Sequence, residues 1–333
     1  MIVSESIARD CLRLIVWYPL RWIILLVPVS WGVTILRLLG DIHCELSRKK
    51  RAQLTENYMR LNPNPDSNTD PNTDPNQYLN LHSSEFKRTN HVIREYFRNH
   101  YIDHLMIFIF PKMGRREIEK YIEFEGLKHL DQALATNRGV ILVHGHFGPV
   151  HLPLVCLSRI GYPLMQIGMP SDEGLSRIGK IVAFRLRMKY EAQLSADIIH
   201  ARSFLRPVIL WLKQNGIVMI TGDGSGAADR VGRYEPFCFL DHRVLFPLGP
   251  ALLSRKTGSA LLPLFIVPGK KKMYRIVIEP PINENGDNAN NNVIVQKFIR
   301  RLEDYVRRWP GYMHFLDRFE VGRLIENENN HGS

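Results

Sequence analysis

Short apolar runs alternate with amphipathic stretches between residues 139 and 309. Runs typical of buried strands are GVILV at 139–143, IVMIT at 217–221, ALLPLFIV at 260–267 and the alternating MYRIVIE at 273–279. Helical spacing of apolar residues predicts helices over 197–215, 250–258 and 293–309, the first ended by Asn215 and Gly216 and the second by Gly258.

This alternation of strands and helices predicts the fold class. We expect an α/β fold, in which a central, mostly parallel or mixed sheet carries helices on both faces. The 333 residues suffice for one large α/β domain or two small ones, and 45% hydrophobic residues against 23% charged residues permit a sizeable core.

The N-terminal stretch from Leu14 to Leu36 reads LIVWYPLRWIILLVPVSWGVTIL and carries one charge, Arg21. Its uncharged part is shorter than the ~20 residues that a spanning helix needs, and Pro28 is expected to kink it. We expect a hydrophobic, membrane-associated helical segment, either a short tilted span or a helix lying in the interface. A buried core helix is the alternative. If the segment is membrane-associated, the run RKKR at 48–51 would lie beside anionic lipid on the cytoplasmic face.

Two polar, low-complexity stretches predict exposed loops, NPNPDSNTDPNTDPN at 62–76 and NENGDNANNN at 283–292. With the apolar segment and the α/β pattern, they suggest a domain organisation. We predict a membrane-anchoring segment at 1–45, a basic and low-complexity stretch at 46–90, a catalytic α/β domain at 91–322 and a polar tail at 323–333.

The net charge of +11 favours anionic partners, such as acidic lipid headgroups, phosphate-bearing cofactors or an acidic carrier protein. Nucleic acid is not expected, because the basic residues are scattered and no zinc-finger spacing or ribonucleoprotein-type aromatic motif is present. The four cysteines form no CxxC pair, which indicates neither a disulfide framework nor a zinc site and favours a reducing compartment.

Residues with catalytic potential follow two of the predicted strands. His144, Gly145 and His146 follow GVILV, and GDGSG at 222–226 follows IVMIT. Sites in open α/β sheets form at the carboxyl ends of strands, and glycines let a ligand approach the backbone closely. These two strand ends are therefore the candidate site.

Pro149 or Pro153 is suited to open the next helix. His146 would then precede the helix and His151 would lie near its first turn, close enough for contact. A helix N-terminus opposes positive charge, so we expect an imidazole there to be neutral and able to accept a proton. The alternative is that these histidines only satisfy local backbone groups.

Two other kinds of site are open. His144, His146, His151 and Asp223 could supply four ligands to a zinc hydrolase, although the acid that usually follows an H-x-H motif is missing. Ser225 lies in D-G-S-G-A, not in a G-x-S-x-G elbow, so we interpret it as a loop residue near the site.

Four segments together resemble a known family. HFGPVH at 146–151, residues 206–223, EPFCFLDHRVLFPLGPALLSRKTGSALLPLF at 235–265 and PGYMHFLDRF at 310–319 are similar in order and spacing to the bacterial lipid A late acyltransferases. That family belongs to the lysophospholipid acyltransferase superfamily. The resemblance extends from the apolar N-terminus to about Phe319.

The resemblance implies roles for particular residues. His146 takes the position of the family histidine, which makes it the implied general base toward an acceptor hydroxyl that attacks an acyl thioester. Asp223 and Arg206 take the positions of a family aspartate and a basic residue that position the acceptor or support the base. Arg206 and backbone N–H groups of residues 224–226 are candidate oxyanion donors. Implied substrate-binding residues are Phe147, Gly148, Gly224, Ser225, Phe237, Pro247 and Gly249.

The chain departs from the family at one hallmark position. In the family motif a histidine is followed by four residues and then by an acid. At the position of that acid this chain has His151. A carboxylate would orient the base and stabilise the imidazolium, whereas a neutral imidazole supplies no negative charge. Three alternatives follow. His151 orients the base more weakly than an acid would, or another acid, most readily Asp223, orients it. In the third, the chain is a non-catalytic relative.

The function implied by the resemblance is acyl transfer in lipid A or phospholipid metabolism. The donor would be a thioester of acyl carrier protein or coenzyme A, and the acceptor a hydroxyl, or less commonly an amine, of a lipid or glycolipid. No cofactor is expected beyond the acyl donor, and no metal. The expected partners are the bilayer, the acceptor and the donor. The expected location is the bacterial inner membrane, with the catalytic body on the cytoplasmic side.

Overall fold

The structure is a computed structural model, which describes residues 7–61, 75–168, 175–193, 196–203, 205–223, 231–282 and 290–326. Most of the predicted loops at 62–76 and 283–292 lie outside these ranges.

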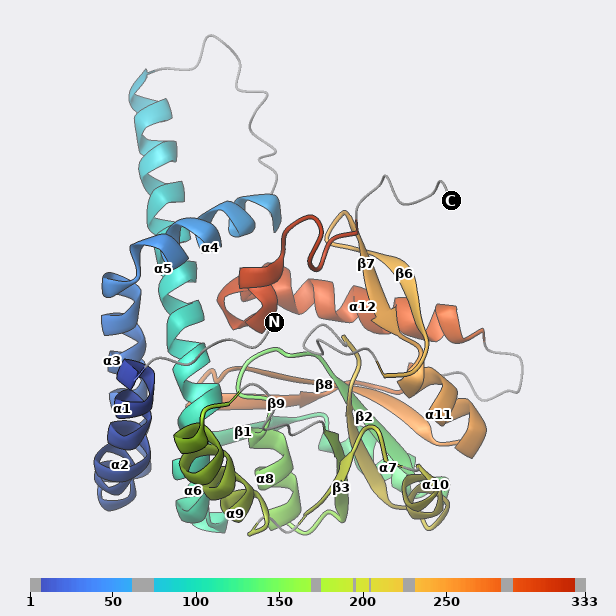
Figure 1. The fold of residues 1–333 in the computed structure, drawn as a ribbon. Coiled ribbons are helices and arrows are strands. Elements are labelled where there is room, and N and C mark those ends of the chain that lie inside the picture. Colours follow the sequence, from blue (N-terminus) through green and yellow to red (C-terminus); the bar gives the residue numbers. More distant parts are fainter. Residues whose placement is uncertain are drawn as a thin grey trace.

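The central feature is a mixed sheet, in which the described strands follow the order β1-β9-β8-β2-β5-β3-β4 (Figure 1). Neighbouring strands pair in parallel except for β8 and β9, which are antiparallel. A separate antiparallel hairpin consists of β6 and β7. The strands are β1 (Ile122–Glu125), β2 (Val140–His144), β3 (Leu164–Gly168), β4 (Ala196–His200), β5 (Ile217–Thr221), β6 (Tyr234–Phe239), β7 (His242–Pro247), β8 (Ala260–Pro268) and β9 (Tyr274–Ile278).

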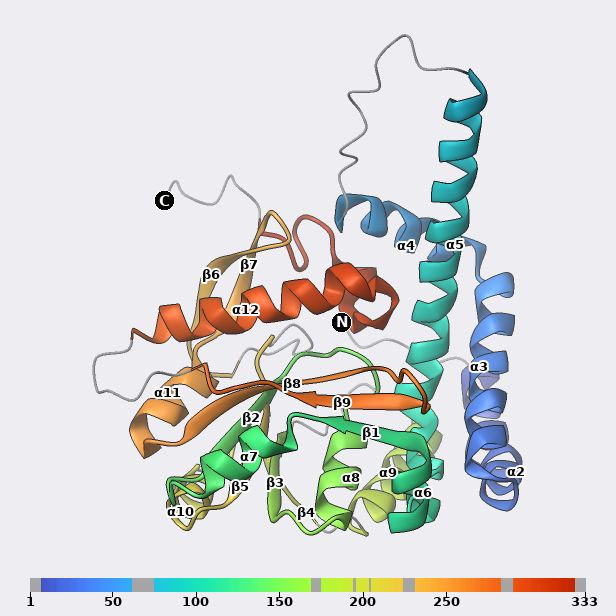
Figure 2. The same ribbon diagram turned by 180° about the vertical axis from the view of Figure 1, so that it is seen from behind.

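Helices surround this sheet (Figures 1 and 2). The α-helices are α1 (Ile7–Ile15), α2 (Arg21–Leu26), α3 (Val29–Leu46), α4 (Arg48–Leu61), α5 (Pro75–Leu105), α6 (Arg115–Tyr121), α7 (Leu127–Leu134), α8 (Leu152–Arg159), α9 (Arg185–Glu191), α10 (Arg206–Lys213), α11 (Gly249–Thr257) and α12 (Asn291–Arg308). Shorter 3₁₀ and π-helical turns are η1 (Val16–Leu20), η3 (Met106–Phe108), η4 (Phe110–Lys112), η5 (Gly179–Phe184), η6 (Pro310–Tyr312) and η7 (His314–Arg318).

Each face of the sheet has its own core. Because side chains alternate along a strand, Ile141 and Val143 of β2 pack in one cluster, while Val140 and Leu142 pack in the other. The first cluster includes α4, α10, α11 and α12, and the second includes α2, α8 and most of the buried residues of α3. Figures 1 and 2 show α12 and α8 on opposite faces. The predicted α/β fold with a mixed sheet and helices on both faces is confirmed.

The predicted strands at 139–143, 217–221, 260–267 and 273–279 correspond to β2, β5, β8 and β9. The prediction of one helix over 197–215 is wrong in its first part. Residues 196–200 form β4, paired in parallel with β3, and α10 begins only at Arg206, with Pro207 in its first turn. Sheet pairing with β3, which lies far away in the sequence, decides the conformation of this stretch.

The apolar N-terminal segment forms α1 to α3, and the chain breaks at Pro28 as predicted. Gly40 lets α3 approach α5, since a Cβ there would lie 2.7 Å from the Arg98 Cα. Arg98 binds both carboxylate oxygens of Asp41, at 2.7 and 2.9 Å. No helix in the described part of the chain is both long and apolar enough to cross a membrane.

Residues 46–90, predicted as a basic and low-complexity stretch, include α4 and part of α5. Leu54 and Tyr58 of α4 are buried in the same cluster as α12, and Asn57 donates a hydrogen bond to the Leu316 carbonyl at 2.8 Å. The predicted limit between residues 90 and 91 falls inside α5. The other predicted domain limits stay predictions.

Candidate active site

The turn between β2 and α8, residues 145–151, carries the candidate base. Gly148 has a φ of +67°, and a Cβ there would lie 2.8 Å from the Ile266 carbonyl oxygen, so this position requires glycine. Its N–H donates to the Tyr312 carbonyl at 2.9 Å. The local sequence therefore bends the chain sharply after a buried strand.

His146 is paired with Asp223, which lies just after the neighbouring parallel strand β5. Nδ1 of His146 donates to Oδ1 of Asp223 at 2.7 Å, and the His146 backbone N–H donates to Oδ2 at 2.5 Å. The side chain of His146 is 31% exposed and that of Asp223 is 10% exposed. The Phe315 ring lies against the imidazole, with 4.6 Å between ring centroids. The carboxylate fixes both the ring and the backbone of His146.

Asp223 also sets the protonation of His146. Burial lowers the pKa of His146, but the charge and hydrogen bond of Asp223 together raise that pKa above its ordinary value. Burial raises the pKa of Asp223, and His146 more than reverses this, so the pKa of the carboxyl group is lowered. The helix N-terminus therefore does not lower the pKa of His146 below its ordinary value, because the carboxylate is the stronger influence.

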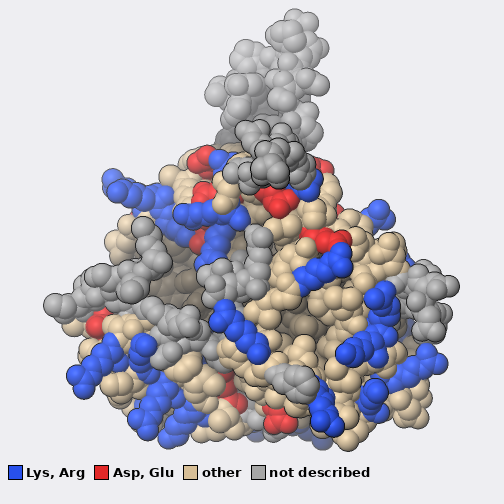
Figure 3. All heavy atoms as spheres, turned by 45° about the vertical axis from the view of Figure 1, so that its right-hand side comes forward, with Lys and Arg blue, Asp and Glu red and all other residues tan. Residues whose placement is uncertain are grey.

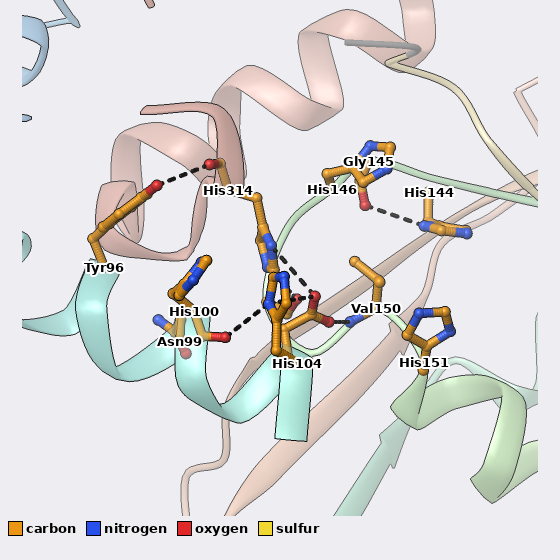
Figure 4. A network of polar contacts seen from close by, with 12 residues as sticks. Tyr96, Asn99, His100, His104, His144, Gly145, His146, Val150, His151 and His314 are labelled. Atoms are coloured by element: carbon orange, nitrogen blue, oxygen red, sulfur yellow. Dashed lines mark hydrogen bonds and ion pairs between the residues drawn. The ribbon is translucent and has the colours of Figure 1, made fainter. Parts of the chain in front are cut away.

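The other histidines of the motif have different contacts, and Figure 4 shows His151 apart from His146. His144 is buried, its Nδ1 donates to the Gly145 carbonyl at 3.1 Å, and burial lowers its pKa to about 4. His151 is the N-cap residue of α8, and its Nε2 lies 3.3 Å from an Arg187 guanidinium nitrogen. Burial, reinforced by Arg187, lowers the pKa of His151. His146 thus bonds to Asp223, not to His151.

The side chains considered as zinc ligands do not converge. In the part of the chain that the structure describes, no group of three or more His, Cys, Asp or Glu side chains is arranged to hold a metal ion. His144, His146, His151 and Asp223 all belong to that part.

The His146–Asp223 pair borders a small apolar cavity of about 20 Å³. Hairpin β6–β7, helix α12 and the segment around η7 supply most of its wall. The lining residues are His146, Phe147, Asp223, Phe239, Val244, Phe246, Leu302, Val306, Met313, Phe315 and Leu324. The arrangement brings a histidine and a carboxylate to the mouth of an apolar space.

The predicted substrate-binding residues are distributed differently. Phe147 lines the cavity and is almost completely buried. The other described residues of the set do not line it: Gly148 holds the turn, while Phe237, Pro247 and Gly249 lie in the hairpin and at the start of α11. Gly224 and Ser225 lie outside the described residues.

Arg206, predicted to support the base or the oxyanion, is exposed at the start of α10. No hydrogen bond found among the described residues joins it to His146 or Asp223. The backbone groups of residues 224–226, the other candidate oxyanion donors, are not described.

Two residues near the turn escaped the sequence analysis. Asp103 on α5 accepts a hydrogen bond from the Val150 N–H at 3.1 Å, and His314 on η7 lies 2.6 Å from the Gly148 carbonyl oxygen through Nε2. The only sequence signal for Asp103 is that this acid lies between His100 and His104, which does not by itself indicate a functional residue. His314 lay within a segment quoted for the family resemblance, but no role was attached to it.

Comparisons with known proteins show the family of the chain. Residues 79–320 match the family described as bacterial lipid A biosynthesis acyltransferase. The chain is 28% identical over 193 residues to the lipid A biosynthesis palmitoleoyltransferase of Escherichia coli (strain K12) and to a lipid A biosynthesis acyltransferase of Shigella flexneri. Each alignment covers 56% of this chain and 60% of the relative. The chain therefore belongs to the bacterial lipid A biosynthesis acyltransferase family.

Proposed function

We propose that this protein transfers a fatty acyl group from an acyl thioester to a hydroxyl group of a lipid A precursor or a related lipid or glycolipid, with His146 as the general base. The observation that carries the proposal is the pairing of His146 with Asp223, 2.7 Å apart, at the edge of an apolar cavity. Family membership supplies the class of reaction.

The geometry supports a definite path for the proton. Because Nδ1 donates to Asp223, Nε2 of the neutral ring is the nitrogen free to accept the proton of the acceptor hydroxyl. The hydroxyl oxygen then attacks the thioester carbonyl and forms a tetrahedral intermediate. Collapse of this intermediate forms the ester and breaks the C–S bond, and the leaving sulfur takes the proton back from Nε2. Asp223 stabilises the imidazolium between the two transfers.

The cavity supports an acyl substrate. Its wall is made of aliphatic and aromatic side chains, while His146 and Asp223 supply the polar groups at one side. The cavity is too small for an acyl chain as it stands, so we propose that its wall opens to admit one. The chain would then bring its carbonyl carbon to the imidazole, and its burial would contribute about 0.8 kcal/mol per CH₂ group. Phe239 and Phe246 of the hairpin would then contact the chain.

The charge of the molecule supports anionic partners. The net charge is +11, and Figure 3 shows Lys and Arg spread widely over one face with few acidic residues among them. An acidic carrier protein, a coenzyme A thioester and anionic lipid would all be attracted to this protein. We propose one of these thioesters as donor, with no further cofactor.

The N-terminal helices support attachment to the bilayer surface. Ile24, Val33 and Leu36 are buried, so the core-helix alternative holds for part of the segment. Other apolar side chains face outward, among them Leu26 at 82% and Trp31 at 67% exposure. The remaining large exposed side chains of these helices are Leu12, Leu14, Ile15, Tyr18, Trp22, Ile23, Leu38, Ile42 and Leu46. We propose that they enter the interface of the bacterial inner membrane from its cytoplasmic side.

The basic run at 48–51 contributes less to this attachment than its sequence suggests. Lys50 pairs with Asp317 at 2.5 Å, and Arg51 pairs with Glu45 at 3.2 Å. Arg48 and Lys49 are exposed and remain available to anionic headgroups.

Binding to vesicles of phosphatidylglycerol and phosphatidylethanolamine tests the attachment. The triple variant Trp22→Ser, Leu26→Ser, Trp31→Ser should lose most binding, because each apolar side chain contributes about 1.5–3 kcal/mol when buried. Leu210→Ser and Val293→Ser, at exposed positions of α10 and α12, are the matched controls and should bind like the wild type. If all variants sediment with the vesicles to the same extent as the wild type, the proposed attachment is contradicted.

Thiol release from an acyl thioester in the presence of a lipid A precursor tests the activity. The wild type should release thiol and form acylated lipid, detected by mass spectrometry, and His146→Ala should lower the rate by about 10²- to 10⁴-fold. His129→Ala on α7 is the matched control. Lipid binding without thiol release in either form would identify a non-catalytic relative, and activity lost with chelators would favour the hydrolase alternative.

A further inference from the structure

A second carboxylate reaches the turn that carries His146, and it comes from α5. Asp103 is largely buried, and its Oδ1 accepts a hydrogen bond from the Val150 N–H at 3.1 Å. Its Oδ2 lies 3.6 Å from Nδ1 of His314. Asp103 therefore joins a helix of the N-terminal half, the turn and a residue near the C-terminus.

His314 completes this connection from the other side of the turn. Its Nε2 lies 2.6 Å from the Gly148 carbonyl oxygen, and its backbone N–H donates to the His146 carbonyl at 3.0 Å. Because a carbonyl oxygen only accepts, Nε2 must carry the proton in this contact. The Tyr96 hydroxyl in turn donates to the His314 carbonyl at 3.3 Å (Figure 4).

Asp103 and His314 form hydrogen bonds with the backbone of the turn at residues 146, 148 and 150. Asp223 bonds to the turn at residue 146. The imidazole must keep its alignment with Asp223 and with the incoming hydroxyl, and small displacements of a reacting group are costly in rate. The titratable groups that interact with Asp103 are His104, at 3.9 Å, and His314, at 3.6 Å. The charge of Asp103 also acts on His100, His146 and His151.

We propose that Asp103 and His314 are positioning residues, which hold the turn so that His146 stays aligned with Asp223. The inference rests on the proposed function of His146 as the base. It concerns contacts distinct from the His146–Asp223 pair, since Asp103 reaches the backbone of residue 150 and His314 reaches the backbone of residues 146 and 148.

Paired substitutions in the full-length protein test the proposal. Asp103→Ala removes the acceptor for the Val150 N–H, whereas Asp103→Asn keeps an acceptor oxygen. His314→Ala removes the donor to Gly148, whereas His314→Gln keeps an N–H donor. His104→Ala is the matched control, because this neighbouring imidazole is 55% exposed and bonds to its own helix at the His100 carbonyl.

Two readouts separate positioning from general stability and from catalysis. Hydrogen–deuterium exchange of peptides covering residues 144–152 should rise in both alanine variants and stay near the wild-type level in Asp103→Asn, His314→Gln and His104→Ala. In thiol-release kinetics, the alanine variants should lose about 10- to 100-fold in kcat with little change in KM, and the conservative variants should recover most of it. Asp103→Ser replaces Asp103→Ala if the latter does not fold, since serine is too short to reach Val150.

The proposal is overturned if exchange over 144–152 is unchanged in the alanine or serine variants, or if Asp103→Asn and His314→Gln are as impaired as those variants. The exchange result does not depend on turnover. A wild type without thiol release would therefore refute the proposed function and leave the exchange test of the positioning role intact.

Discussion

The two ends of the turn between β2 and α8 carry the same side chain in opposite environments. At one end, His146 faces a carboxylate from the neighbouring strand end, is partly exposed and has a raised pKa. At the other end, His151 caps α8, faces the Arg187 guanidinium and has a lowered pKa. Five positions in sequence thus separate a ring with a raised pKa from a ring with a lowered pKa.

This difference shows what supplies the negative charge at the site. The family places an acid where this chain has His151, yet Asp223 lies against His146. Parallel pairing of β2 with β5 brings the two strand ends together, so an acid after β5 can reach the ring from across the sheet. The substitution at residue 151 is therefore compatible with an oriented base.

Among changes to the surroundings of the two histidines, the largest effect is expected from removing the charge next to His146. Asp223→Asn keeps the size of the side chain and an acceptor for the His146 backbone N–H, but it no longer stabilises the imidazolium. We expect kcat to fall by about 10²-fold with a small change in KM. Steady-state thiol release gives both constants, and wild-type kcat in this variant would exclude Asp223 as the partner of the base.

A much smaller effect is expected at the other end of the turn. His151→Ala removes a contact with Arg187, which already pairs with Glu191 at 2.6 Å, and leaves the His146–Asp223 pair intact. The rate should change by less than about fivefold, which corresponds to an interaction of ~1 kcal/mol. A loss as large as that of His146→Ala would assign His151 a direct role in proton transfer.

The smallest effect on catalysis, but a clear effect on stability, is expected at His144. Burial lowers its pKa to about 4, and its Nε2 has no hydrogen-bond partner among the described residues. Because the folded-state pKa lies below the ordinary 6.5, the unfolded chain binds the proton first, and stability should fall as pH decreases from 6.5 toward 4. His144→Gln should flatten this dependence in thermal unfolding experiments. An identical dependence in wild type and variant would contradict the assignment.

The sequence predicted the parts of the fold in which local pattern and sheet position agree. Four apolar runs became β2, β5, β8 and β9, and Gly258 ends α11 with a φ of +73°. The sequence-based prediction is wrong where pairing with a strand that is distant in sequence determines the secondary structure. The helix predicted over 197–215 rests on the apolar spacing of residues 204–212, and its first residues belong instead to β4 beside β3. The sequence analysis also predicts no strands at the hairpin β6–β7.

The same limit applies to the site. His146 and Asp223 are predictable because each follows an apolar run typical of a buried strand, and sites in open α/β sheets form at the carboxyl ends of strands. Asp103 and His314 were not, since α5 and η7 approach the turn only through tertiary packing across 211 positions of sequence (Asp103 to His314). No pattern within α5 distinguishes a buried acid that binds a distant backbone N–H from an exposed one.

The pH dependence of kcat/KM in wild type and Asp223→Asn tests the central claim most directly. The base must be unprotonated, so activity should rise with pH through the pKa of His146, and in the wild type this rise should lie above 6.5 because Asp223 raises that pKa. In Asp223→Asn, burial and the charge of Arg318 lower the pKa of the ring and only the charge of Asp103 raises it, so the rise should shift to lower pH while the plateau falls. Coincident profiles in the two proteins, or activity that falls as pH increases across this range, would contradict His146 paired with Asp223 as the general base.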